Sequence, residues 1–134
     1  MTEPTPNFTT LFDAQPTYEQ LAAAFDAIEA DITYIDDADI VRYYSPFRIF
    51  ERPPSCLNAN VYDCHPPRTH AEVRDMLDAF RAQAKDTVSQ EITLPDDHPG
   101  DQADVGRTVR ICYHAIRDRA GTYLGCLEVA TFRD

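Results

Sequence analysis

The sequence predicts an α+β fold in which helices cover one face of a five-stranded antiparallel sheet, with an extra helix at the N-terminus. Apolar residues recur at helical spacing in two segments, one near residues 17–30 and one near residues 68–84. Five other segments alternate apolar and polar residues, two of them before the second helix and three after it. This order of elements is typical of helices packed against one side of an antiparallel sheet.

Residues 1–16 are rich in Pro and Thr and lack periodicity, which indicates a flexible leader before a single domain over 17–134. The stretch "PTYEQLAAAFDAIEA" then predicts an N-terminal helix over 17–30. Thr17 is its expected N-cap, and Gln20 completes a capping box. The apolar residues at helical spacing are Tyr18, Leu21, Phe25 and Ile28.

The core of the domain is expected over residues 31–132. The segments "DITYID" and "IVRYYS" flank a "DDAD" turn and predict a first pair of strands. A proline-broken stretch follows and indicates short helical turns. Thr69 is the expected N-cap of the longer helix, with Glu72 three residues later. Three further strands are expected in "DTVSQEITL", "RTVRICYHAI" and "TYLGCLEVATF", with Gly121 in the last hairpin turn.

The charge balance excludes several classes of partner. The chain has 12 Lys and Arg residues and 23 Asp and Glu residues, which gives a net charge of -11. Nucleic acids and anionic membrane surfaces both require basic residues, so neither is expected as a partner. No apolar run approaches the roughly 20 residues that span a bilayer, and no secretion signal is recognisable, so we expect a cytoplasmic protein. Four cysteines without a C-x-x-C pair are then expected to be reduced thiols.

The stretch "VYDCHPPRTH", Val61 to His70, concentrates reactive side chains at the start of the longer helix. Adjacent Cys64 and His65 make a poor metal pair, because their side chains diverge and zinc sites prefer spaced ligands. Catalysis would need a base that reaches the thiol, and His65 is poorly placed for that. The remaining alternatives are that His65 anchors the loop, or that it lines a ligand pocket.

The motif "CHPPRTHAEV" and the later "GRTVRICYHAIRDRAGTYLGCLEV" resemble a known family. They are similar to the PAS (Per-Arnt-Sim) domain found at the C-terminus of bacterial proteins that also carry hemerythrin-like domains. The resemblance covers about residues 28–132. It implies a PAS fold and a sensory role, but no particular ligand. The matching residues are Cys64, His65, Pro66, Pro67, Ile111, Tyr113, Ala115, Gly121, Tyr123, Gly125, Leu127 and Glu128.

His70, Cys112 and His114 depart from the family pattern. His70 shares a helix face with apolar residues, so a haem ligated by His70 is one alternative. Cys112 and His114 are expected on the outer face of the sheet. Glu128 is expected there too, paired with Arg110 or Arg42. No flavin-binding Asn-Cys-Arg-Phe motif is present, which argues against light sensing.

The expected function is a sensory domain that binds a small ligand between the sheet and the helices and acts through contacts with other proteins. The partners we expect are a second copy of the chain, a small molecule and a separate signalling protein. Two alternatives stay open: an interaction module without a ligand, and a haem or metal redox sensor. The expected pocket lining is Tyr43, Phe47, Cys64, His65, His70, Leu77 and Tyr113.

Overall fold

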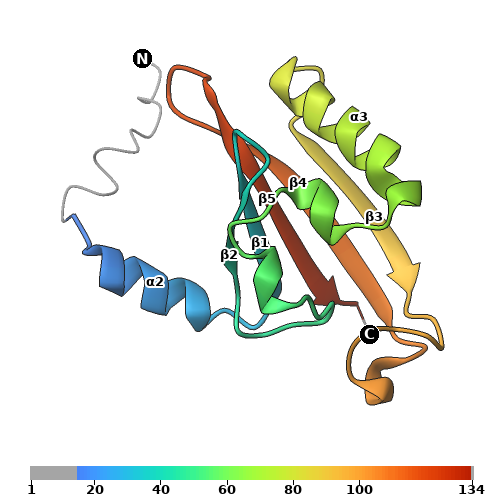
Figure 1. Ribbon diagram of the computed structural model, residues 1–134. Helices are drawn as coiled ribbons and strands as arrows, with labels where there is room; N and C mark the ends of the chain where they lie inside the picture. Colours follow the sequence, from blue (N-terminus) through green and yellow to red (C-terminus); the bar gives the residue numbers. More distant parts are fainter. Residues whose placement is uncertain (1–14, 134) are drawn as a thin grey trace, which may run out of the picture.

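The computed structural model describes residues 15–133, which form one five-stranded antiparallel sheet with strand order β2-β1-β5-β4-β3 (Figure 1). This confirms the predicted fold class. The strands are β1 (Asp31–Asp36), β2 (Val41–Tyr44), β3 (Thr87–Thr93), β4 (Thr108–Arg117) and β5 (Tyr123–Phe132), and the α-helices are α2 (Tyr18–Asp26) and α3 (His70–Arg81). Short 3-10 turns occupy Pro54–Cys56 (η1), Val61–Cys64 (η2), Pro67–Thr69 (η3) and Gln102–Asp104 (η4).

The two α-helices begin in different ways. Thr17 and Gln20 form the predicted capping box on α2, although the helix ends at Asp26, earlier than expected. Thr69 occupies the predicted N-cap position of α3, but the expected side-chain cap is absent. Thr69 also closes the 3-10 turn η3, and its hydroxyl donates to the carbonyl of Pro66 at 2.9 Å instead of accepting from the helix. The proline pair thus positions the start of α3 through η3.

The helix α3 and the long connection that precedes it lie on one face of the sheet, whereas α2 lies beside the β2 edge (Figure 1). The side chains of Leu77 and Phe80 are completely buried between α3 and the sheet. They pack in a cluster whose other buried members are Ile35, Val41, Val61 and Cys126. A second cluster lies along the same sheet and contains Ile49, Leu94, Val109, Ile111 and Ala130.

A disulfide joins Cys56 to Cys64, with 5.8 Å between the two Cα atoms. The expectation of four reduced thiols is therefore wrong, and only Cys112 and Cys126 are free. Spacing alone gave no signal, because the two cysteines are eight positions apart. The turns η1 and η2 fold back on each other and bring the thiols together. The bond fixes the connection immediately before the "HPP" motif.

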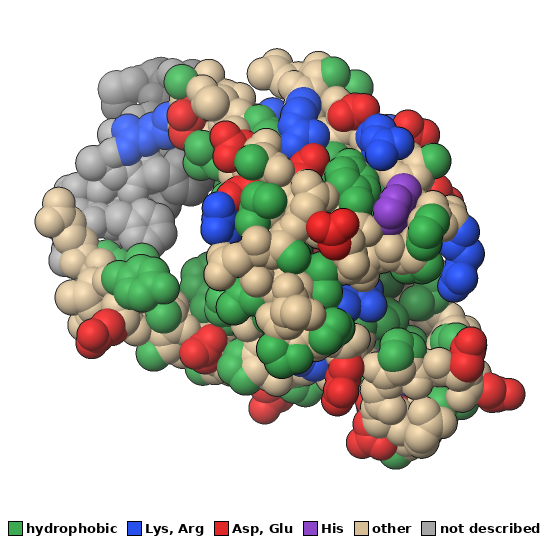
Figure 2. All heavy atoms as spheres, viewed as in Figure 1, with side chains coloured by type: hydrophobic (Ala, Val, Ile, Leu, Met, Phe, Trp, Pro, Cys, Tyr) green, Lys and Arg blue, Asp and Glu red, His purple; other side chains and the backbone are tan. Residues whose placement is uncertain are grey.

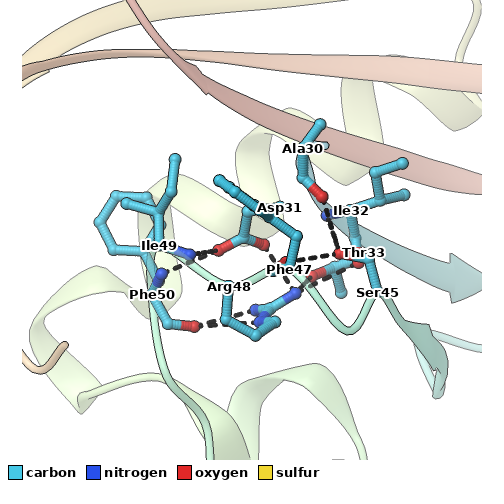
Figure 3. A network of polar contacts seen from close by, with 9 residues as sticks. All are labelled: Ala30, Asp31, Ile32, Thr33, Ser45, Phe47, Arg48, Ile49 and Phe50. Carbon is cyan, nitrogen blue, oxygen red and sulfur yellow. Dashed lines mark hydrogen bonds and ion pairs between the residues drawn. The ribbon is translucent and has the colours of Figure 1, made fainter. Parts of the chain in front are cut away.

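The segment after β2 is attached to the start of β1 by a buried carboxylate (Figure 3). Asp31 is fully buried, and its Oδ1 lies 2.6 Å from Nη1 of Arg48. Its Oδ2 accepts hydrogen bonds from the backbone N–H groups of Ile49 and Phe50, at 2.9 and 2.8 Å. Arg48 also donates to the Phe50 carbonyl at 3.0 Å. The ion pair and the two backbone hydrogen bonds offset the cost of the buried charge and hold the connection against the sheet.

Within residues 15–133, no helix is both long enough and apolar enough to cross a membrane.

Candidate functional site

A cavity of about 360 Å³ lies between α3 and the face of the sheet that α3 covers. Small-molecule sites usually have volumes of about 300 to 1,000 Å³, so the cavity can hold a small ligand. The segments that line it are β1, η2, α3, β3, β4 and β5. Its lining residues are Ile35, Val61, His65, Glu72, Val73, Asp75, Met76, Ala79, Lys85, Val88, Gln90, Tyr113 and Glu128.

Glu128 lies on the inner face of β5, where it is paired across the strands with Tyr113 of β4 and Thr33 of β1. The prediction that Glu128 lies on the outer face is wrong, and so is its expected pairing with Arg110 or Arg42. Residues opposite each other on antiparallel strands share a face, so Tyr113 and Glu128 both project toward α3. The pair forms part of the cavity wall.

The Glu128 carboxyl has no hydrogen bond or ion pair with any residue of the described part of the chain. Burial, the larger cause, and the nearby Asp31 carboxylate together raise its pKa to about 7. The guanidinium groups of Arg52 and Arg48 act in the opposite direction. A carboxyl group with this pKa exists in both protonation states near neutral pH, and such groups often mark functional sites.

The rim of the cavity carries exposed charged side chains, whereas its wall is apolar. Glu72 and Asp75 lie exposed on α3, and Lys85 follows the helix. Apolar side chains fill the wall between rim and base: Ile35, Val61, Val73, Met76, Ala79 and Val88. The cavity thus combines an apolar wall, a carboxyl group at its base and two further carboxylates at its mouth.

His65 holds the end of η2 and also lines the cavity. Its Nδ1 lies 2.9 Å from the carbonyl oxygen of Val61. A carbonyl oxygen only accepts, so Nδ1 carries the proton and Nε2 is left as an acceptor. Burial lowers the pKa of His65, which favours the neutral ring. Both alternatives raised from the sequence apply to this residue, because it anchors the loop and lines the cavity.

The other residues expected around the pocket lie in different places. Tyr113 lines the cavity with His65, and Cys64 lines a small adjoining space that Glu128 also borders. Leu77 is fully buried in the core beside the cavity. Phe47 is 37% exposed and borders neither space. Tyr43 lies on the opposite face of the sheet, so the expectation that it lines this cavity does not hold. A role in ligand binding stays a prediction for the residues that do line it.

His70 is turned away from the position that a haem ligand would need. Its Nε2 donates to the carbonyl of His65 at 2.9 Å, and its ring contacts the edge of Tyr62. His70 does not line the cavity. Within the described residues, no group of three His, Cys, Asp or Glu side chains is arranged to hold a metal ion. His70 is therefore not placed to ligate a haem in this cavity.

Glu128 and Gln90 line the cavity, but sequence patterns do not predict this position for either residue. On β5 both rows of side chains are apolar, since Leu127 and Val129 face outward while Cys126 and Ala130 face inward. Alternation alone therefore cannot assign Glu128 to a face. The strand register assigns Glu128 to the inner face, because it places Glu128 opposite Tyr113, which is expected on that face.

The outer face of the sheet carries a second hollow, of about 470 Å³, between α2 and the strands. Tyr43 donates to Asp26 of α2 at 3.0 Å, and its ring meets the edge of Phe25. The register confirms that Cys112 and His114 face this side, opposite Val129 and Leu127. The hollow is lined by Tyr18, Leu21, Ala22, Phe25, Tyr34, Arg42, Tyr43, Ile116 and Leu127.

The sheet order, the helix across one face and the cavity between them agree with the result of a family comparison. The family model for the PAS domain matches residues 21–132. This chain belongs to the PAS domain family. PAS domains are generally sensory and signalling modules without catalytic activity of their own.

Solved structures share this PAS fold. The C-terminal domain of a protein from Streptococcus mutans is 27% identical, with a TM-score of 0.75, over 87% of this chain and 85% of that one. A PAS domain from Colwellia psychrerythraea is 16% identical, with a TM-score of 0.58, over 85% and 94%. A sensory box histidine kinase from Vibrio cholerae is 9% identical, with a TM-score of 0.56, over 95% and 98%. No curated protein matches this chain.

Proposed function

We propose that this PAS domain binds a small organic ligand in the cavity under α3 and signals its presence by changing its association with another protein. The observation that carries the proposal is the cavity itself. It is about 360 Å³ in volume, and apolar side chains and a few polar groups converge on it from six segments of the fold. A module that served only for dimerisation would have no need to keep this space open.

The signal would pass from the cavity to the surface of the protein through α3 and the sheet, which both border the cavity. The cavity is bordered by Val73, Met76 and Ala79 of α3, and by Tyr113 and Glu128 of the strands. A ligand that binds one arrangement of helix and sheet more tightly shifts the population toward it. The opposite face of the same strands, together with α2, is the surface that a partner contacts, so a shift in the sheet changes what the partner binds.

We propose a second copy of the chain as that partner. Leu21, Phe25 and Ile28 are 39 to 45% exposed, and no residue of α2 is buried. Figure 2 shows hydrophobic side chains open to solvent over α2. An amphipathic helix that contacts its own domain so sparsely gains stability when another apolar surface covers it. The resemblance to hemerythrin-associated PAS domains supports a further, separate signalling partner.

A thermal-shift screen against a metabolite library tests ligand binding. In Ala79→Leu the larger side chain enters the cavity from α3, and leucine is a good helix former. In the matched control Ala71→Leu the same change is made at an exposed position of the same helix, outside the cavity. We expect compounds that raise the melting temperature of the native protein and of Ala71→Leu but not that of Ala79→Leu. Compounds that stabilise all three proteins equally would contradict binding in this cavity.

A further inference from the structure

We infer that the cavity is selective for a small organic cation, a protonated amine with an apolar body, whose charged group lies against Glu128. This inference rests on the proposed function, because it names the class of ligand that the same cavity would take. Three properties of the lining favour such a cation: its charge, its hydrogen-bonding groups and its apolar surface.

The ionisable lining is predominantly acidic. Glu72, Asp75 and Glu128 supply three carboxyl groups, and Lys85 supplies the only side chain in this lining that is always positive. The His65 ring is kept neutral by burial. The chain as a whole carries a net charge of -11, so its field adds to the local preference for cations. An anionic ligand would meet these carboxylates without a paired arginine in the lining.

The two arginines nearest the base of the cavity, Arg48 and Arg52, do not form an ion pair with Glu128. Arg48 is held by the buried Asp31 carboxylate at 2.6 Å. Arg52 borders the small adjoining space of about 10 Å³, not the main cavity. Among residues 15–133, Glu128 therefore forms no ion pair, although both guanidinium groups are close enough to lower its pKa. A ligand cation would supply the partner that the protein does not.

Two hydrogen-bonding groups of the cavity, on Glu128 and His65, also suit a donor. The Glu128 carboxylate accepts only, and His65 has Nε2 left as an acceptor once Nδ1 donates to Val61. An ammonium group has three donors and no acceptor, which matches these groups. Apolar side chains of α3 and β3, chiefly Val73, Met76 and Val88, offer a surface for the body of the molecule.

Protonation of Glu128 should then compete with cation binding. The charged or titratable groups around its carboxyl come from every neighbouring element: Asp31, Tyr44, Arg48, Arg52, His65, Glu72, Asp75, Lys85, Tyr113 and Cys126. Burial raises the pKa of Glu128 to about 7 and lowers the pKa of His65. A cation that stays charged should therefore bind roughly tenfold more tightly at about pH 8 than at about pH 6.

The test uses amide NMR spectra of the native protein with three probes of one shape: 2-phenylethylamine, 2-phenylethanol and 3-phenylpropanoate. We expect the amine to shift the cavity signals of Val73, Met76 and Tyr113. It should bind at least about tenfold more tightly than the carboxylate, a difference of about 1.4 kcal/mol. Glu128→Gln should weaken the amine by about tenfold and remove its pH dependence. Glu91→Gln, the same change at an exposed glutamate of β3, should leave both unchanged.

The outcomes separate this inference from the proposed function. If the alcohol or the carboxylate binds in the cavity as tightly as the amine, and Glu128→Gln makes no difference, the cation assignment is wrong while ligand binding stands. If none of the three probes moves a cavity signal at millimolar concentration, the proposed ligand-binding function is itself contradicted.

Discussion

At Glu128 the fold holds a carboxyl group that burial and a neighbouring carboxylate keep partly protonated. Its pKa is about 7 in the folded chain, against 4.5 for an unperturbed glutamate. Between these two values the folded chain binds a proton that the unfolded chain has released. The free energy of unfolding therefore falls as the pH rises from about 4.5 to about 7, and the loss persists above that. Such a cost is typical of a residue retained for function.

Glu128→Gln should remove this cost. We expect the variant to match the native protein near pH 4.5 and to exceed its unfolding free energy by about 2 to 3 kcal/mol at about pH 8. Urea denaturation at the two pH values measures the difference, with Glu91→Gln as the exposed control. An equal difference at both pH values would show that the effect comes from packing and not from the carboxyl charge.

Arg48 and Arg42 provide a matched test of the polar network beside the cavity. Arg48 neutralises the buried Asp31, so Arg48→Met leaves a buried carboxylate without its ion-pair partner and should cost about 3 to 5 kcal/mol. Arg42 pairs with Asp36 at the surface, so Arg42→Met should cost no more than about 1 kcal/mol. Urea denaturation measures both, and similar costs would contradict the structural role assigned to Asp31.

At the scale of elements, the connection between β2 and α3 forms one side of the cavity wall and holds that side in place. The disulfide between Cys56 and Cys64 closes a short loop there, and a bond of this span stabilises a fold by about 2 to 3 kcal/mol. Reduction should therefore lower the unfolding free energy of the native protein by that amount. The double variant Cys56→Ser/Cys64→Ser should not respond to the reductant.

Thiol counting decides whether this bond is present in solution. Alkylation of the unfolded, unreduced chain should modify two cysteines, Cys112 and Cys126, and modification of all four after reduction provides the control. Four modified thiols before reduction would contradict the disulfide.

The elements show where sequence patterns suffice. All five strands lie where alternation predicts them, and the capping box at Thr17 is present, because these features depend on neighbouring residues alone. The disulfide, the face of Glu128 and the position of Tyr43 depend on strand register and on how the proline-rich connection folds back. Strand register and the path of this connection both depend on residues more than about ten positions apart. Sequence patterns therefore predict a pocket but assign part of its lining to the wrong residues.

At the scale of the whole molecule, the two faces of the sheet have separate roles in this account. The inner face forms the cavity with α3, and the outer face with α2 is proposed to meet a second copy of the chain. Phe25→Glu should then convert a dimer to a monomer, because it places a charge among apolar residues of α2 that are only partly covered. Sedimentation equilibrium measures the mass.

Leu57→Glu is the matched control for this experiment. Leu57 is 44% exposed, close to the 41% of Phe25, but it follows η1 and lies outside the hollow beside α2. This variant should keep the mass of the native protein. A native protein that is already monomeric, or one that Phe25→Glu leaves dimeric, would contradict association through α2.

The central claim is that one small molecule occupies the cavity under α3, and native mass spectrometry tests it most directly. The native protein is incubated with a metabolite extract, desalted and measured beside Ala79→Leu and Ala71→Leu. We expect one added mass per chain on the native protein and on Ala71→Leu, and the bare mass for Ala79→Leu. A bare mass for all three proteins, or the same added mass on all three, would contradict this claim.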